Sequence, residues 1–168
     1  MTNHVKPIVL VGPAGVGKTT VGKKLANSLG LSFLDTDALF VKDHGPISEF
    51  FAANGESAFR RLEEDYLSYA LSSSGVIATG GGAILSEANR QALKVATVVY
   101  LKTDGTHMHK RLSQGTRPLL KNGIDDWRRI YDERKPIYES VADITVDCSG
   151  HPIKQTLMEI KAELDKHE

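Results

Sequence analysis

Residues 12–19 read Gly-Pro-Ala-Gly-Val-Gly-Lys-Thr, which matches the phosphate-binding pattern Gly-x-x-x-x-Gly-Lys-Ser/Thr. This stretch follows a continuously apolar run, residues 8–11, and precedes a helical pattern over residues 18–29. Glycines let consecutive backbone N–H groups converge on phosphate oxygens, at a helix N-terminus whose dipole already favours anions. We expect Lys18 to reach the β- and γ-phosphates and the Thr19 hydroxyl to reach Mg²⁺. The expected nucleotide-binding residues of this loop are Gly15, Val16, Gly17, Lys18, Thr19 and Thr20.

Outward from this loop, short apolar runs alternate with helical patterns. Further strands are predicted at residues 32–34, 76–79, 97–101 and 144–146. Helical stretches are predicted within residues 38–72, 87–93, 106–112 and 125–138, and again after residue 152. Gly30 is expected to end the first helix. Strands that alternate with helices indicate βαβ units, a parallel sheet and an α/β fold, and the length of 168 residues indicates one domain, 1–168.

The overall charge is balanced, because Lys+Arg and Asp+Glu both total 21. Such a balance argues against a nucleic-acid partner or an anionic membrane surface, both of which attract basic patches. The one cysteine, Cys148, permits no internal disulfide, which fits a reducing cytosol. No apolar stretch has the length of a signal peptide core or a membrane span. We therefore expect a cytoplasmic protein, and we also expect a monomer.

Two aspartates follow the second predicted strand, in the sequence Asp35-Thr36-Asp37. Ligands of open α/β sheets bind at this carboxyl edge. A spacing of two puts both carboxylates on the same side of an extended segment. One carboxylate could then serve the Mg²⁺ shell and the other could accept a hydrogen bond from an attacking hydroxyl. The alternative is that one of them merely caps the following helix.

Three glycines, residues 80–82, follow the third predicted strand. They indicate either that the backbone makes room for something or that it adopts dihedral angles which only glycine tolerates, with a plain flexible turn as the alternative. On the preceding helical stretch, Arg60 and Glu63 are three residues apart and share a face. Taken alone, that pair would be interpreted as a surface ion pair.

Two further arginines are candidates for phosphate or substrate contacts. Arg117 lies on a segment between Gly115 and Gly123, as expected for a lid that closes over phosphates. Arg134 lies near the end of a predicted helix. Either residue alone would be interpreted as a solvated charge.

Together these motifs closely resemble shikimate kinase. The matching segments run along nearly the whole chain: GPAGVGKTT, LGLSFLDTD, NGESAFRRLE, VIATGGGAIL, VVYLK, RPLL and ERKPIYESVAD. The resemblance implies a three-layer P-loop fold with a five-stranded parallel sheet in the order 2-3-1-4-5. It also implies substrate-binding helices over about residues 36–72 and a lid over about residues 113–124. The implied reaction is phosphorylation of the 3-hydroxyl of shikimate by ATP, with Mg²⁺ as cofactor, on the pathway to chorismate and the aromatic amino acids.

The resemblance also implies a role for each matching residue. Lys18 and Arg117 correspond to the cations on the ATP phosphates, and Thr19 and Asp35 to the residues at the metal. Asp37 corresponds to the aspartate that contacts the shikimate hydroxyls and is the candidate base. The implied substrate-binding residues are Asp37, Arg60, Gly82 and Arg134, in which the two arginines clamp the carboxylate. His151 lies in a variable loop that corresponds to the adenine contact.

Two rival functions remain as alternatives. A related P-loop kinase for gluconate or a nucleoside monophosphate would keep the phosphate loop, but it would explain neither Arg60 with Arg134 nor the three glycines. A nucleotide-gated switch would have no small-molecule acceptor. It would require guanine-specificity motifs, and the Asn-Lys-x-Asp pattern does not occur in the sequence.

Overall fold

The computed structural model describes residues 6–108, 120 and 122–167. Its strands form one parallel sheet in the order β2-β3-β1-β4-β5, which confirms the predicted topology. The strands are β1 (Ile8–Val11), β2 (Phe33–Asp35), β3 (Val76–Ala78), β4 (Thr97–Lys102) and β5 (Ile144–Asp147). The helices and short 3-10 turns are α1 (Lys18–Leu29), α2 (Thr36–His44), α3 (Ile47–Leu71), η1 (Ala83–Leu85), α4 (Glu87–Ala92), η2 (Leu93–Val95), α6 (Ile124–Val141) and α7 (Ile153–Lys166).

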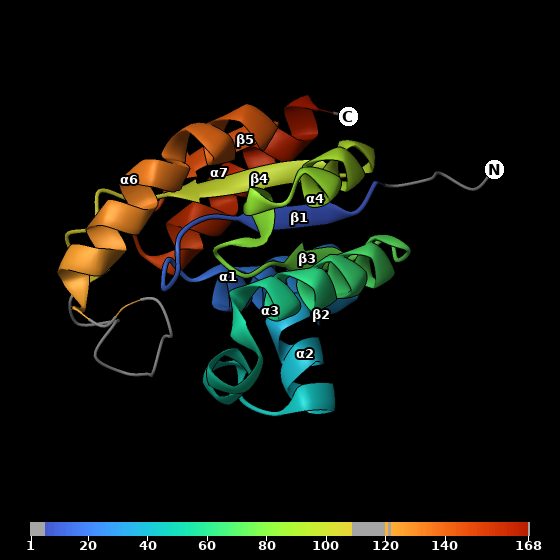
Figure 1. Ribbon diagram of the computed structural model, residues 1–168. Helices are drawn as coiled ribbons and strands as arrows, with labels where there is room; N and C mark the ends of the chain where they lie inside the picture. The colour runs from blue at the N-terminus through green and yellow to red at the C-terminus, as the bar shows by residue number, and fades with distance from the viewer. Residues whose placement is uncertain (1–5, 109–119, 121, 168) are drawn as a thin grey trace.

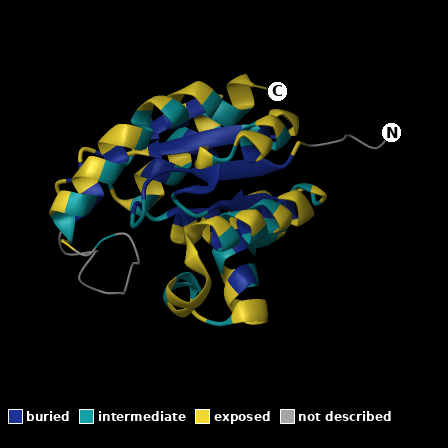
Figure 2. Ribbon diagram, viewed as in Figure 1, coloured by how far each residue is buried: buried dark blue, intermediate teal, exposed yellow. Residues whose placement is uncertain are grey.

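The central strand β1 lies between β3 and β4 and is buried along its whole length (Figure 2). Val9 pairs in register with Ile77 on one side and with Val98 on the other. All three of these side chains are 1% exposed or less. A strand covered on both faces needs apolar residues at every position, which is why residues 8–11 show no alternation.

Helices cover both faces of this sheet and make the three-layer arrangement (Figure 1). Helices α1 and α7 contact each other on one face, whereas α3, α4 and α6 meet around η1 on the other. Helix α2 and the first turns of α3 project beyond the sheet (Figure 1). Among the described residues, no helix is both long enough and apolar enough to cross a membrane.

The boundaries of the elements follow local signals in the sequence. Gly30 ends α1 in a left-handed conformation (φ 68°), and its N–H and that of Leu31 close back on the carbonyl of Ala26, so the predicted C-cap is confirmed. Helix α3 is bent at Gly55, whose φ of 86° and ψ of 169° lie outside the helical region. The helix predicted over residues 106–112 lies outside the described residues beyond Met108.

Candidate functional site

The phosphate loop joins the buried end of β1 to the first turn of α1. Gly17 caps α1 with φ 106° and ψ 22°, a conformation in which a side chain would be strained. The amine of Lys18 folds back over the loop and donates hydrogen bonds to the carbonyls of Gly12 (2.7 Å) and Pro13 (2.8 Å). Lys18 is only 8% exposed, so its charge is held against the phosphate loop. Thr19 and Thr20 follow on the exposed first turn.

The two aspartates after β2 do not lie together on an extended segment, so that part of the expectation is wrong. The chain turns helical at Thr36, because Asp35 caps α2. Its Oδ1 accepts hydrogen bonds from the N–H groups of Asp37 (2.9 Å) and Ala38 (3.1 Å). Its Oδ2 accepts the hydroxyl of Thr19 at 2.5 Å. Asp35 therefore caps the helix and also faces the phosphate loop, while Asp37 lies within the first turn of α2.

Beside the phosphate loop, at the carboxyl edge of the sheet, lies a cavity of about 190 Å³. Charged side chains line the cavity together with aromatic and aliphatic side chains. The polar residues that line it are Asp37, Arg60, Glu63, Tyr131, Arg134 and Tyr138, together with the backbone of residues 80–82. The apolar residues that line it include Pro13, Ile47, Phe51, Phe59, Leu120 and Trp127.

The three glycines at this cavity are required by close approach and not by unusual dihedral angles. Gly82 has φ −99° and ψ 5°, and none of the three has a positive φ. A Cβ on Gly80 would lie 2.9 Å from Asp37 Oδ1 and 3.0 Å from Glu63 Oε2. A Cβ on Gly82 would overlap the guanidinium of Arg60. The interpretation as a plain flexible turn therefore does not hold, because side chains here would displace the charged groups of the cavity.

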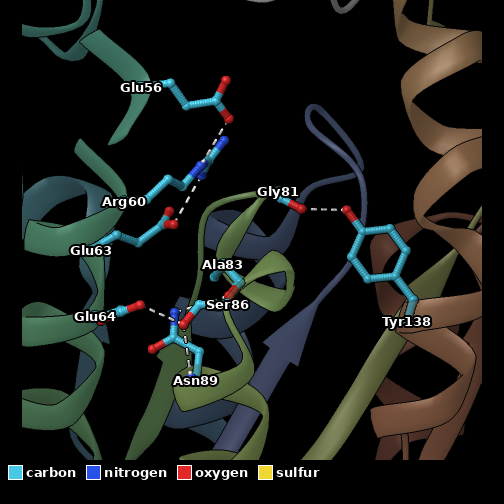
Figure 3. Close-up of polar contacts among 9 residues, drawn as sticks. All are labelled: Glu56, Arg60, Glu63, Glu64, Gly81, Ala83, Ser86, Asn89 and Tyr138. Carbon is cyan, nitrogen blue, oxygen red and sulfur yellow. Dashed lines mark hydrogen bonds and ion pairs between the residues drawn. The ribbon is translucent and has the colours of Figure 1, made fainter. Parts of the chain in front are cut away.

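Arg60 and Glu63 form an ion pair that is not a surface pair (Figure 3). Arg60 Nη1 donates to Glu63 Oε1 at 2.9 Å, and Arg60 Nε donates to Glu56 at 3.3 Å. The side chain of Glu63 is 3% exposed and that of Arg60 is 18% exposed. Burial raises the pKa of Glu63, and the charge of Arg60 opposes that rise. Two acceptors thus fix the guanidinium where it faces the cavity.

Arg134 lines the same cavity from a different helix, α6. It lies well inside α6, which continues to Val141, and not near a helix end as the sequence suggested. Burial raises the pKa of Tyr138, while the charge of Arg134 and its hydrogen bond to the tyrosine oppose the rise. The structure therefore brings Arg60 and Arg134 together with Asp37 around one space, although they lie on three different helices.

The segment after the glycines is fixed by polar contacts from two helices (Figure 3). The amide of Asn89 donates to the carbonyl of Ala83 at 2.9 Å. Ser86 caps α4 and its hydroxyl also donates to Glu64 of α3 at 2.6 Å. The backbone at the cavity is thereby tied to the helix that carries Arg60.

The remaining expected site residues are Arg117 and His151. Arg117, with most of the predicted lid, lies outside the described residues, although Leu120 does line the cavity. His151 lies between β5 and α7, and its Nδ1 is 3.9 Å from Glu159. It does not line the cavity.

Sequence reasoning missed Trp127 and underestimated Glu63. The indole N–H of Trp127 donates to the carbonyl of Ala14 in the phosphate loop at 2.8 Å. Trp127, Arg134 and Tyr138 are spaced by seven and then four residues, so they lie on one face of α6. The sequence already showed this spacing, which places two aromatic residues and one arginine on the same helix face. Nothing in the sequence indicated that Glu63 would be buried.

Comparison with known proteins agrees with this geometry. The family model described as shikimate kinase matches residues 14–165. A shikimate kinase of Rhodococcus jostii is 41% identical over 93% of this chain and 96% of the relative. A shikimate kinase of Salinispora arenicola is 44% identical over 92% of this chain and 95% of the relative.

Solved structures give the same result. A shikimate kinase from Acinetobacter baumannii in complex with shikimate superposes with a TM-score of 0.92 at 36% identity, and the match covers 98% of this chain and 95% of that one. A gluconokinase from Sinorhizobium meliloti shares the fold with a TM-score of 0.64, but only 18% of its sequence. The alternative function as a gluconate kinase is thus supported by the fold alone. The chain belongs to the shikimate kinase family.

Proposed function

We propose that this protein transfers the γ-phosphoryl group of ATP to the 3-hydroxyl of shikimate and releases ADP and shikimate 3-phosphate. The observation that carries the proposal is the cavity beside the phosphate loop, which holds two arginines and one aspartate between aromatic walls. Shikimate has one carboxylate and three hydroxyls on a compact ring. A paired guanidinium grip suits the carboxylate, and a carboxylate acceptor suits a hydroxyl.

In this proposal Arg60 of α3 and Arg134 of α6 both bind the carboxylate of shikimate. Gly82 leaves the space in which the Arg60 guanidinium lies. The ring packs between the aromatic and aliphatic side chains of the cavity, which exclude water that would otherwise compete as acceptor.

Asp37 accepts the hydrogen bond of the 3-hydroxyl and receives its proton. The hydroxyl oxygen forms a bond to the γ-phosphorus while the bond to the bridging oxygen of ADP breaks. Such a transfer needs alignment and neutralisation of charge more than covalent chemistry from the protein. The loop amides and Lys18 supply positive charge at the phosphates. We propose the same role for Arg117, which lies outside the described residues.

The residues after β1 and β2 fit a magnesium ion. The hydroxyl of Thr19 and Asp35 Oδ2 are adjacent oxygen donors at the phosphate loop, and the other oxygen of Asp35 is occupied by the helix cap. Mg²⁺ prefers oxygen ligands and takes few from the protein, with phosphates and water completing its shell. When bound, it would neutralise charge on the β- and γ-phosphates. Thr19 and Asp35 would hold it, Asp35 directly or through water.

A coupled ADP-release assay with a panel of acceptors tests this function. Shikimate should raise ADP release far above the rate without an acceptor, whereas gluconate and nucleoside monophosphates should not. A rate that gluconate or a nucleotide raises, and that shikimate leaves unchanged, would contradict the proposal. A nucleotide-gated switch would show the same slow hydrolysis with every acceptor.

A further inference from the structure

Helix α6 contacts both loops of the site through one face. Trp127 and Tyr138 lie eleven residues apart on that face, which corresponds to about 16 Å along the helix axis. Arg134 lies between them and lines the cavity. Each of the two aromatic residues is 2% exposed or less, and each donates a hydrogen bond to a backbone carbonyl of a different loop.

The first bond joins α6 to the phosphate loop. Trp127 Nε1 donates to the carbonyl of Ala14 at 2.8 Å. The guanidinium of Arg128 lies 5.3 Å from the centroid of the indole ring and also donates to the carbonyl of Asp104 at 2.9 Å. The contact with Arg128 restricts rotation of the indole, whose N–H points at the carbonyl of Ala14.

The second bond joins α6 to the triple-glycine loop (Figure 3). The hydroxyl of Tyr138 donates to the carbonyl of Gly81 at 2.5 Å and is also hydrogen-bonded to Arg134. The ring stacks on Tyr100 of β4 with centroids 5.2 Å apart. Tyr138 thus connects the carboxylate-binding side chain to the backbone that it must face.

The two loops also touch each other between these bonds. A Cβ on Gly81 would lie 3.2 Å from the backbone nitrogen of Ala14. The residues that accept the two hydrogen bonds are therefore the ones at which the loops meet. Movement of α6 at either end would change the distance between the two loops, and with it the distance between the phosphoryl donor and the phosphoryl acceptor.

We propose that Trp127 and Tyr138 are positioning residues, of which Trp127 holds the phosphate loop for the nucleotide and Tyr138 holds the triple-glycine loop and Arg134 for the acceptor. This inference rests on the proposed function. Each hydrogen bond acts on one substrate, so loss of one bond should raise KM mainly for that substrate and much less for the other. A merely structural role for these side chains would lower stability and leave both substrates equally affected.

The test uses the conservative variants Trp127→Phe and Tyr138→Phe. Loss of one buried hydrogen bond corresponds to roughly two- to tenfold in binding. Tyr138→Phe should raise KM for shikimate by about that factor or more, because Arg134 also loses a partner, and should leave KM for ATP within about twofold. Trp127→Phe should raise KM for ATP and lower kcat, and it should change the shikimate dissociation constant less, because phenylalanine keeps an aromatic ring at the wall of the cavity.

The matched control is Tyr100→Phe. It removes a hydroxyl from the same aromatic cluster, where Tyr100 and Tyr131 share a hydrogen bond of 2.6 Å, and Tyr100 does not line the cavity. This variant should lower the melting temperature without moving either KM. If Tyr100→Phe also raises KM mainly for one substrate, or if neither test variant moves its own KM, the inference is overturned.

A measurement on the wild-type protein covers the case in which Trp127→Phe does not fold. The chain has one tryptophan, so its emission reports the indole at Ala14. Binding of ADP should change that emission, and an unchanged emission overturns the inference for Trp127. Phosphorylation of shikimate by the wild-type protein in the same experiments separates failure of this inference from failure of the proposed function.

Discussion

Gly82→Ala offers a sharp test of how the cavity holds the carboxylate of shikimate. The backbone of Gly82, with φ −99° and ψ 5°, is open to alanine, so the substitution strains no dihedral angle. The new methyl group would instead overlap the guanidinium of Arg60. That group is the far end of a flexible side chain, so it moves aside, and the fold should survive.

The expected loss follows from what the guanidinium does. Displaced Arg60 can no longer make its charged hydrogen bonds to the carboxylate, and such bonds contribute about 1.5–3 kcal/mol. The shikimate dissociation constant should therefore rise roughly ten- to a hundredfold. The ATP dissociation constant should not change, because Lys18 and the phosphate loop are untouched. Isothermal titration calorimetry with each ligand measures both values, and thermal unfolding checks that the fold is intact.

A double-mutant cycle with Arg60→Ala identifies the route of the effect. If alanine at position 82 acts only by displacing Arg60, it should add little once Arg60 is absent. Wild-type affinity for shikimate in Gly82→Ala would refute the reasoning. So would a loss in the double variant equal to the sum of the two single losses.

Four further predictions concern the other charged groups of the site. Lys18→Ala should cost a few kcal/mol in kcat/KM with the fold retained, and near-normal turnover of the folded variant would contradict the phosphate-loop assignment. Arg134→Ala should weaken shikimate binding by about 2–5 kcal/mol in calorimetry with little change for ATP, and equal losses for both ligands would count against the clamp. Arg117→Ala should lower single-turnover rates by on the order of a thousandfold but raise the ATP dissociation constant much less, and Arg117→Lys should restore part of the lost rate. Wild-type turnover of Arg117→Ala would mean that Arg117 is a surface charge with no part in the reaction. Burial raises the pKa of the Glu63 carboxyl above its ordinary 4.5, so the folded chain binds a proton there more tightly than the unfolded chain does. This tighter binding stabilises the folded chain at low pH, and the stabilisation is lost as pH rises from 4.5 through the folded-state pKa. The stability of Glu63→Gln relative to the wild-type protein should therefore rise across that window in urea denaturation, and a constant difference would contradict the burial argument.

The fold was accessible from the sequence because its signals are local. Residues 8–11 are apolar at every position, Gly30 ends the first helix, and the phosphate loop lies between them. These features specify a buried parallel strand and a crossover helix without knowledge of distant contacts. The order of the strands came from the resemblance to a family and not from periodicity.

The arrangement of the site was only partly accessible, because it depends on contacts between distant segments. The sequence could show that Arg60 and Glu63 share a helix face, but not that this face would turn toward the cavity and bury Glu63. It could place Asp35 and Asp37 after a strand, but the capping hydrogen bonds that turn Thr36 helical decided how they point. The bond from Trp127 to Ala14 spans 113 residues and had no local signal.

Analysis of the reaction product tests the central claim most directly. The wild-type protein, ATP, Mg²⁺ and shikimate are incubated, and phosphorus and proton NMR identify where the phosphoryl group is attached. The account predicts a phosphate ester at the 3-hydroxyl, formed in equal amount with ADP. ADP accompanied by inorganic phosphate, or an ester at another hydroxyl, would contradict the placement of Asp37 and the two arginines around the acceptor.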